Sequence, residues 1–148
     1  EKFNLVAEEY YKACENNDEK AILQAAEKFH SAYEAMNRVV KPFVKEMDLF
    51  HQTLYVIYHK NYPDKNYAEI AKVMDTFISQ ADAITKYPQD KLERRLKDKT
   101  QNYYTYAKAL YEATVNLKEV LALNNPEKSD QAVEKLHKAY QKLETVFE

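Results

Sequence analysis

The sequence predicts an all-α protein, folded as an antiparallel up-and-down helical bundle, and three observations support this. The 148 residues contain no glycine and only four prolines. Tight β-hairpins and phosphate-binding loops need residues that tolerate positive φ, most often glycine, so these features argue against a β-sandwich, a Rossmann domain or a P-loop enzyme. Lys, Glu, Ala, Leu and Gln, which favour helices, fill the chain. Apolar residues recur at helical spacing between short breaker segments.

Breakers and caps divide the chain into helical segments. We expect helices over residues 3–15, 19–40, 43–61, 66–86, 89–123 and 126–147. Pro42 is expected to kink or restart the chain, because proline removes a backbone donor and clashes with the preceding turn. Asn66 with Glu69 has the pattern of a capping box, and Pro126 fits the first position of the last helix. The connections are short, so sequential helices are expected to lie antiparallel.

A repeated segment is the strongest organisational signal in the chain. Residues 24–33 (QAAEKFHSAY) and 131–140 (QAVEKLHKAY) are identical at seven of ten positions. An Asn-Asn pair precedes each segment, at positions 16–17 and 124–125. In both places one residue separates this pair from a Glu-Lys pair, which also lies before the segment. Each copy therefore predicts a helix, an Asn-Asn turn and a second helix that carries a histidine.

This repeat predicts how the helices are organised. We expect the hairpins 3–40 and 107–147 to be duplicates that pack with pseudo-two-fold symmetry as a four-helix bundle. Residues 43–106 are then expected to extend one end of that bundle as further helices, within a single domain of residues 1–148. A fragment of a longer repeat protein is the alternative expectation.

Charge and cysteine content exclude several classes of partner. The 22 basic and 24 acidic residues interleave and give a net charge of −2, so nothing resembles the basic stripe that binds nucleic acid. No apolar run approaches about 20 residues, so we expect no membrane span. Cys14 is the single cysteine and excludes an internal disulfide or a thiolate metal site. The chain begins at Glu1, and we expect an extracytoplasmic, periplasmic protein, with a trimmed chain as the alternative.

Two histidines occupy equivalent positions of the repeat. His30 and His137 each follow a Glu by three residues and precede a Tyr by three. If both faced one groove, they would form a bis-imidazole site for haem, or a copper or zinc site. The alternative is that each histidine bonds a nearby Tyr or Glu and specifies packing. Glu-x-x-His on two helices is also half of a di-iron pattern, but the helical wheel turns Glu27 and Glu134 toward water.

A second candidate set lies on the predicted helix 43–61. Met47, His51 and Tyr55 form an i, i+4, i+8 stripe, which would be a soft copper-binding edge. Met47 fits the apolar core pattern as well, and core packing is the alternative. The aromatic-rich segment 54–63 is expected to pack as the end of an amphipathic helix, although an exposed Tyr stripe would be a protein-binding patch.

Nucleophilic catalysis has no support in the sequence. Only three serines are present, and without glycine the usual nucleophile turn is missing. Cys14 lies near the end of a predicted helix, where the dipole disfavours a thiolate. We therefore expect that the protein is not an enzyme.

The segments around the two repeat histidines resemble a known family. Residues 134–144 (EKLHKAYQKLE) and 27–36 (EKFHSAYEAM) are similar to the last helix of the cytochrome b562 and cytochrome c′ bundles, in which a histidine ligates haem. The resemblance implies a periplasmic four-helix bundle with His137 as haem ligand. No CxxCH precedes His137, which excludes covalent haem attachment. The segment 3–13 contains no Met to act as second ligand, which leaves His30 for that role.

These observations favour a non-enzymatic extracytoplasmic binding protein. It would hold a metal ion or haem through His30 and His137, with His51 and Met47 as further metal ligands. The alternative is a ligand-free helical scaffold or protein-interaction module, self-association included, in which the histidines are packing residues.

Overall fold

The structure is a computed structural model that describes residues 2–16, 18–40 and 43–148. Every regular element in these ranges is a helix, which confirms the all-α prediction. The chain forms two units, Glu1–Pro42 and Phe43–Glu148, which we call the hairpin unit and the bundle unit. The predicted kink at Pro42 lies outside the described residues.

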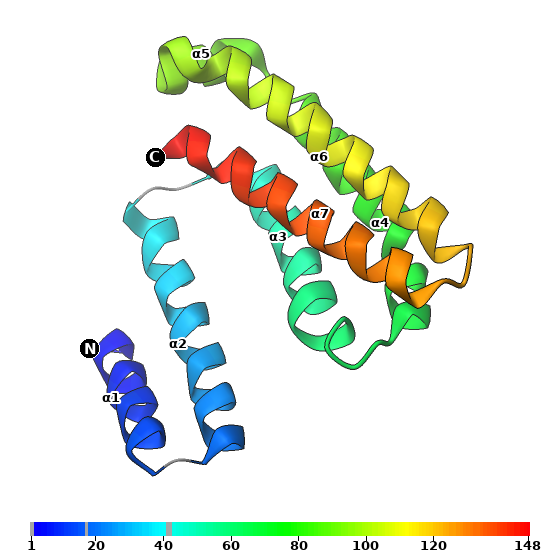
Figure 1. Cartoon of the computed structure of the whole chain (residues 1–148). Helices are drawn as coiled ribbons and strands as arrows, with labels where there is room; N and C mark the ends of the chain where they lie inside the picture. Colours follow the sequence, from blue (N-terminus) through cyan, green and yellow to red (C-terminus); the bar gives the residue numbers. More distant parts are fainter. Residues whose placement is uncertain (1, 17, 41–42) are drawn as a thin grey trace. The chain divides into compact units, whose positions relative to one another are not determined.

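The hairpin unit consists of α1 (Lys2–Glu15) and α2 (Glu19–Val40), which run side by side in opposite directions (Figure 1). Asp18 caps α2, because its carboxylate accepts a hydrogen bond from the Ala21 amide at 3.1 Å. Cys14 is exposed near the end of α1. The two helices expected in this segment are therefore present, while Asn17 between them lies outside the described residues.

Aromatic rings hold the two helices of the hairpin unit together. The Phe29 ring on α2 packs against Phe3 and Tyr10 of α1, with ring centroids 5.2 and 5.8 Å apart. Among the described residues of this unit, only Ala13 and Ala25 are buried apolar residues. The packed rings of Phe3, Tyr10 and Phe29 are only partly buried, so the seam between α1 and α2 is less deeply buried than the core of the bundle unit.

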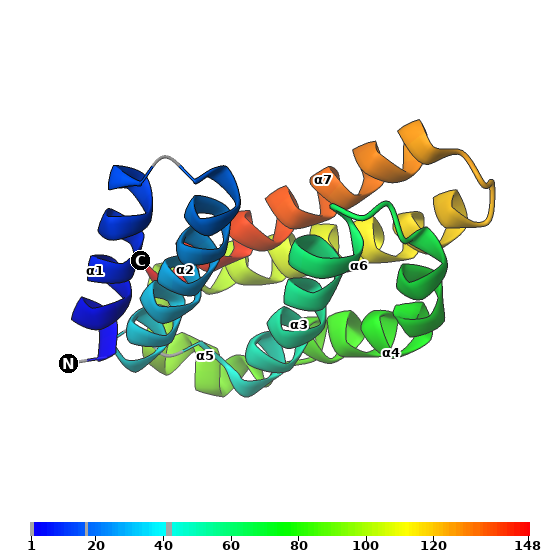
Figure 2. The ribbon, with the colours of Figure 1, turned by 90° about the horizontal axis from the view of Figure 1, so that it is seen from below.

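The bundle unit contains five α-helices: α3 (Lys45–Val56), α4 (Tyr67–Thr85), α5 (Gln89–Leu96), α6 (Thr100–Leu121) and α7 (Pro126–Glu144). A π-helix at Ile57–Asn61 continues α3, and short 3₁₀ turns follow α5 and α7. α3 packs on α4, α4 on α6 and α6 on α7, so the four long helices share one core (Figure 2). Residues 43–106 supply α3, α4, α5 and the start of α6 to this unit, and their role as an extension of a bundle made by the two hairpins stays a prediction. The pairing of the two hairpins in one domain stays a prediction, because each unit is described by itself.

The caps of α4 and α7 lie where the sequence places them. The Asn66 side chain accepts from the Glu69 amide at 3.4 Å, and the Asn125 side chain accepts from the Lys128 amide at 3.0 Å. Pro126 is the first residue of α7, where its missing N–H leaves no intrahelical bond unmade. Both predicted helix starts are confirmed.

The long helix predicted over residues 89–123 is wrong. The chain breaks after Leu96 into a 3₁₀ turn, and α6 begins only at Thr100. At this break Lys97 takes a φ of 52°, which a continuous α-helix does not allow. The Thr100 hydroxyl donates to the Lys97 carbonyl at 2.8 Å and fixes the break.

Three turns of the bundle unit need a residue with positive φ. Lys65, Lys97 and Asn124 take φ values of 53°, 52° and 51°. A positive φ costs a residue with a Cβ on the order of 1–3 kcal/mol, and glycine avoids most of this cost. The chain therefore makes its turns without glycine, at the expense of local strain.

The core of the bundle unit is centred on stacked rings. Phe50 of α3 lies 4.1 Å from Phe77 of α4 and 5.7 Å from Tyr140 of α7, between ring centroids. Tyr103 of α6 is fully buried, and its hydroxyl donates to the Ile84 carbonyl at 3.0 Å. Among the helices of the described ranges, none is both long and apolar enough to cross a membrane.

Candidate functional site

The predicted copper-binding stripe lies in and beside the core of the bundle unit. Met47 is fully buried, and His51 is buried with its ring stacked on Tyr140 at 5.3 Å between centroids. Tyr55 is half-buried, and its ring contacts that of His59 at 4.8 Å. A metal ion bound by Met47 and His51 would have to displace core packing, so the geometry favours the alternative that these side chains are packing residues.

His137 packs against a tyrosine of the π-helix. The His137 and Tyr58 rings stack with centroids 3.8 Å apart and planes at 15°. The Tyr58 hydroxyl donates to the Glu134 carboxylate at 3.1 Å. Glu134 was expected to point into water, and the structure corrects this, because the π-helix brings Tyr58 over that face of α7. Burial and then the Glu134 carboxylate raise the pKa of Tyr58.

His30 lies on α2 in the hairpin unit, with its side chain exposed. His137 lies in the bundle unit, and each unit is described by itself. A haem or metal site that uses both histidines therefore stays a prediction. Across residues 2–16, 18–40 and 43–148, no group of three or more His, Cys, Asp or Glu side chains is placed to hold a metal ion.

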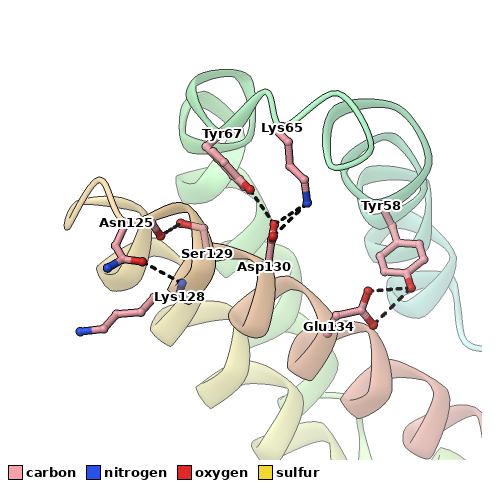
Figure 3. Close-up of polar contacts among 8 residues, drawn as sticks. All are labelled: Tyr58, Lys65, Tyr67, Asn125, Lys128, Ser129, Asp130 and Glu134. Carbon is pink, nitrogen blue, oxygen red and sulfur yellow. Dashed lines mark hydrogen bonds and ion pairs between the residues drawn. The ribbon is translucent and has the colours of Figure 1, made fainter.

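Asp130 on α7 anchors the turn between the π-helix and α4 (Figure 3). It accepts a hydrogen bond from the Tyr67 hydroxyl at 2.6 Å and from the Lys65 ammonium at 2.9 Å. The Tyr67 hydroxyl and then Lys65 hold the pKa of Asp130 below its usual range. These contacts join residues more than sixty positions apart, so no local sequence pattern could have indicated them.

Replacing Tyr67 with Phe is expected to lower the free energy of unfolding by about 1 kcal/mol at pH 7, through loss of its bond to Asp130. A carboxylate with a depressed folded-state pKa stabilises the fold above its unfolded pKa, and this is lost as pH falls through the folded pKa. The difference between wild type and Tyr67→Phe should therefore shrink below about pH 4. Urea unfolding followed by circular dichroism, at a series of pH values, measures it.

Tyr104→Phe is the matched control for this experiment. The Tyr104 hydroxyl donates at 2.6 Å to the backbone carbonyl of Tyr87, not to a carboxylate. Its loss should lower stability by a similar amount at pH 7 and at pH 3. Equal pH dependence in the two variants would contradict the role given to Asp130.

A shallow hollow of about 470 Å³ lies along α7 beside this anchor. Its walls are five polar side chains of α7: Asp130, Gln131, Glu134, Lys135 and Lys138. Two carboxylates and two ammonium groups balance one another, so the hollow favours neither anions nor cations.

The exposed apolar side chains gather in the hairpin unit. Nine large apolar residues are exposed among the described residues, and six belong to the hairpin unit. These six are Leu5, Tyr11, Leu23, Tyr33, Met36 and Val39. Tyr33 and Met36 lie on α2 at helical spacing from Phe29, on one apolar face, and the structure leaves both exposed. Sequence periodicity shows that a face is apolar, but it does not identify what covers that face.

The two units thus offer different chemistry. In the bundle unit, His51 and His137 stack on tyrosine rings, and no metal-binding group is found in the described part of the chain. The hairpin unit presents apolar side chains on a pair of helices. Comparisons with protein-family models, curated proteins and solved structures found no match for this chain.

Proposed function

We propose that this chain is a non-enzymatic protein-interaction module, in which the hairpin unit docks onto a partner and the bundle unit is its folded support. One observation carries the proposal: the hairpin unit exposes six large apolar side chains, while Ala13 and Ala25 are its buried apolar residues among those described. Apolar surface left in water is unfavourable at about 25 cal/mol per Å². A protein partner that covers these side chains would recover that free energy.

The histidine contacts support the interaction module over a ligand-binding protein. His51 stacks on Tyr140 and His137 stacks on Tyr58, so both rings have a packing role that needs no ligand. Aromatic pairs of this kind contribute about 0.5–1.5 kcal/mol beyond the area they bury. Stacking on a tyrosine ring is therefore sufficient to explain why histidine occupies these two positions.

Two expectations from the sequence stay predictions beside this proposal. Haem or metal binding through His30 and His137 is tested by visible spectra and elemental analysis of the protein after addition of haem, copper or zinc. Loss of any bound species in a variant with both histidines changed to Ala would establish that binding. The extracytoplasmic location is tested by fractionation of cells that produce the full-length protein.

A photo-crosslinking amino acid in place of Tyr33 is expected to capture a discrete partner from cells that make the protein. Tyr33 is exposed on α2, within the proposed docking surface. The same amino acid in place of Leu123, an exposed residue of the bundle unit, should not capture that partner. Mass spectrometry identifies the products. Changing Met36 to Lys should weaken capture at position 33, because it places a charge in the apolar contact.

Equal capture at positions 33 and 123 would contradict the proposal. It would show that the products come from nonspecific contact with apolar surface. Capture that persists at full yield with Met36→Lys would also count against docking through α2.

A further inference from the structure

Charges that are interleaved along the sequence of α7 are separated onto different faces of the helix. α7 contains four lysines and four acidic residues. At about 100° per residue, the lysines share an arc of roughly 80°, and the acidic residues fall outside it. We call these lysines the α7 lysine stripe: Lys128, Lys135, Lys138 and Lys142. In Figure 3 the Lys128 side chain points away from Asp130 and Glu134.

The stripe lysines lack the ion pairs that other cations of the bundle unit make. Six lysine and arginine side chains of this unit lie beside a carboxylate: Lys65, Lys72, Lys86, Arg94, Lys108 and Lys118. All four stripe lysines are exposed, and no carboxylate of the described residues pairs with Lys128, Lys135 or Lys138. The Lys142 ammonium lies over the Tyr106 ring, 5.1 Å from its centroid.

Comparison with α2 shows that the helix pattern does not require these lysines. Asp18 caps α2 as Asn125 caps α7, so each residue of α2 corresponds to the residue 107 positions later. The α2 counterparts of the stripe are Ala21, Lys28, Ser31 and Ala35. The one lysine among them pairs with Glu9 of α1. Two helices whose repeated segments agree at seven of ten positions thus differ in this charge.

Like charges are neighbours within the stripe. Lys138 follows Lys135 by three residues and precedes Lys142 by four, the spacings at which side chains meet on a helix. Equal charges at these spacings destabilise a helix. Glu134 lies one turn before Lys138, but its carboxylate accepts from the Tyr58 hydroxyl at 3.1 Å. Carboxylates supplied by another molecule would reduce the repulsion and complete the missing ion pairs.

We propose that the α7 lysine stripe binds an acidic segment of another protein. Lys128 and Lys142 are fourteen residues apart, so the segment would carry carboxylates along about 21 Å of α7. Complementary charge orients such a contact and accelerates association. The inference goes beyond docking through the hairpin unit and does not depend on it.

The narrow width of the stripe favours a single chain segment over a broad polyanion. Glu127 and Glu134 lie roughly 20° and 40° beyond Lys138 around the helix. A DNA duplex or an anionic membrane is wider than one helix face, so its phosphates would meet these carboxylates and be repelled. The hollow lined by Asp130 and Glu134 is balanced in charge, so the acidic segment would follow the ammonium groups outside it.

A fluorescein-labelled peptide of three Glu-Ala-Ala-Ala-Glu-Ala-Ala repeats is the probe that tests the inference. We expect it to bind the full-length protein saturably in fluorescence anisotropy at about 20 mM salt. Binding should weaken at about 150 mM salt, because salt screens exposed charges. Lys135→Glu together with Lys138→Glu should weaken binding by about tenfold or more, and Arg at both positions should retain it. The same peptide with Gln in place of every Glu should not bind.

The matched control is Lys91→Glu together with Lys99→Glu, which changes the net charge equally but away from the stripe. Both lysines are exposed and precede α6. This variant should bind the peptide within about twofold of wild type. Equal loss in the two double variants would overturn the inference, because net charge alone would then explain the binding. Circular dichroism verifies that each variant is folded, as expected for substitutions at exposed positions.

Two further outcomes would overturn an acidic protein segment as the partner. The first is that no saturable peptide binding is detected at low salt. The second is that a DNA duplex, or vesicles containing phosphatidylserine, bind more tightly than the peptide and lose this binding when Lys135 and Lys138 are reversed. Neither outcome changes partner capture at position 33, so the proposed function would stand without this inference.

Discussion

Replacing Phe50 with Ala is expected to lower the free energy of unfolding of the bundle unit by about 3–5 kcal/mol. Phe50 is fully buried and stacks on Phe77 and Tyr140, so one ring joins three helices. Truncation removes the transfer free energy of the ring and leaves a cavity that surrounding side chains fill only in part.

Leu49→Ala is the matched control, since Leu49 precedes Phe50 on α3 and is exposed. We expect it to change stability by less than about 1 kcal/mol, because little buried area is lost. Chemical denaturation of both variants, followed by circular dichroism, measures the difference. A cost below about 1 kcal/mol for Phe50→Ala would show that the stacked rings are not the centre of the core.

Backbone amides of α1 and α2 are expected to exchange with solvent at least about a thousandfold faster than the buried amides of α4 and α6. Stability of about 0.05–0.15 kcal/mol per residue gives a unit as long as the bundle unit several kcal/mol. Among the described residues of the hairpin unit only Ala13 and Ala25 are fully buried apolar residues, so it should open locally at a lower cost than the bundle unit. A difference of about 4 kcal/mol in opening free energy is a thousandfold difference in exchange. Hydrogen exchange read by mass spectrometry measures it.

Two equivalent substitutions test whether the units open independently. Phe29→Ala removes the ring that joins α2 to α1, and Leu136→Ala removes the buried counterpart in α7. The first should accelerate exchange in the hairpin unit alone, and the second in the bundle unit alone. If either variant accelerated hydrogen exchange equally in both units, the result would contradict the division of the chain into two units that open independently.

The helices and several of their ends could be predicted from the sequence because they depend on local contacts. Asn66 and Asn125 cap their helices through bonds to amides three residues away, so a short window contains the whole interaction. The break at Lys97 was not predicted, because its cause is tertiary. The apolar spacing continues through that region, and only the requirements of the core show that the helix must stop.

The candidate site could be predicted only in part. The helical wheel places Met47 and His51 on an apolar face, but it does not show how deeply each side chain is buried. It therefore cannot distinguish a buried packing residue from an accessible metal ligand. The contact between Tyr58 and Glu134 joins positions 76 residues apart and depends on the π-helix. Neither the pairing of these two residues nor the π-helical backbone produces a periodic pattern in the sequence.

The position of the single cysteine has a practical consequence for handling the protein. Cys14 is exposed on α1, and no other thiol exists in the chain with which it could pair. A disulfide between two copies of this chain would therefore join them through their hairpin units. Oxidation during storage would produce a covalent dimer that imitates self-association, and a reducing agent removes this artefact. The same thiol accepts one maleimide dye, which labels the hairpin unit and leaves the bundle unit unmodified.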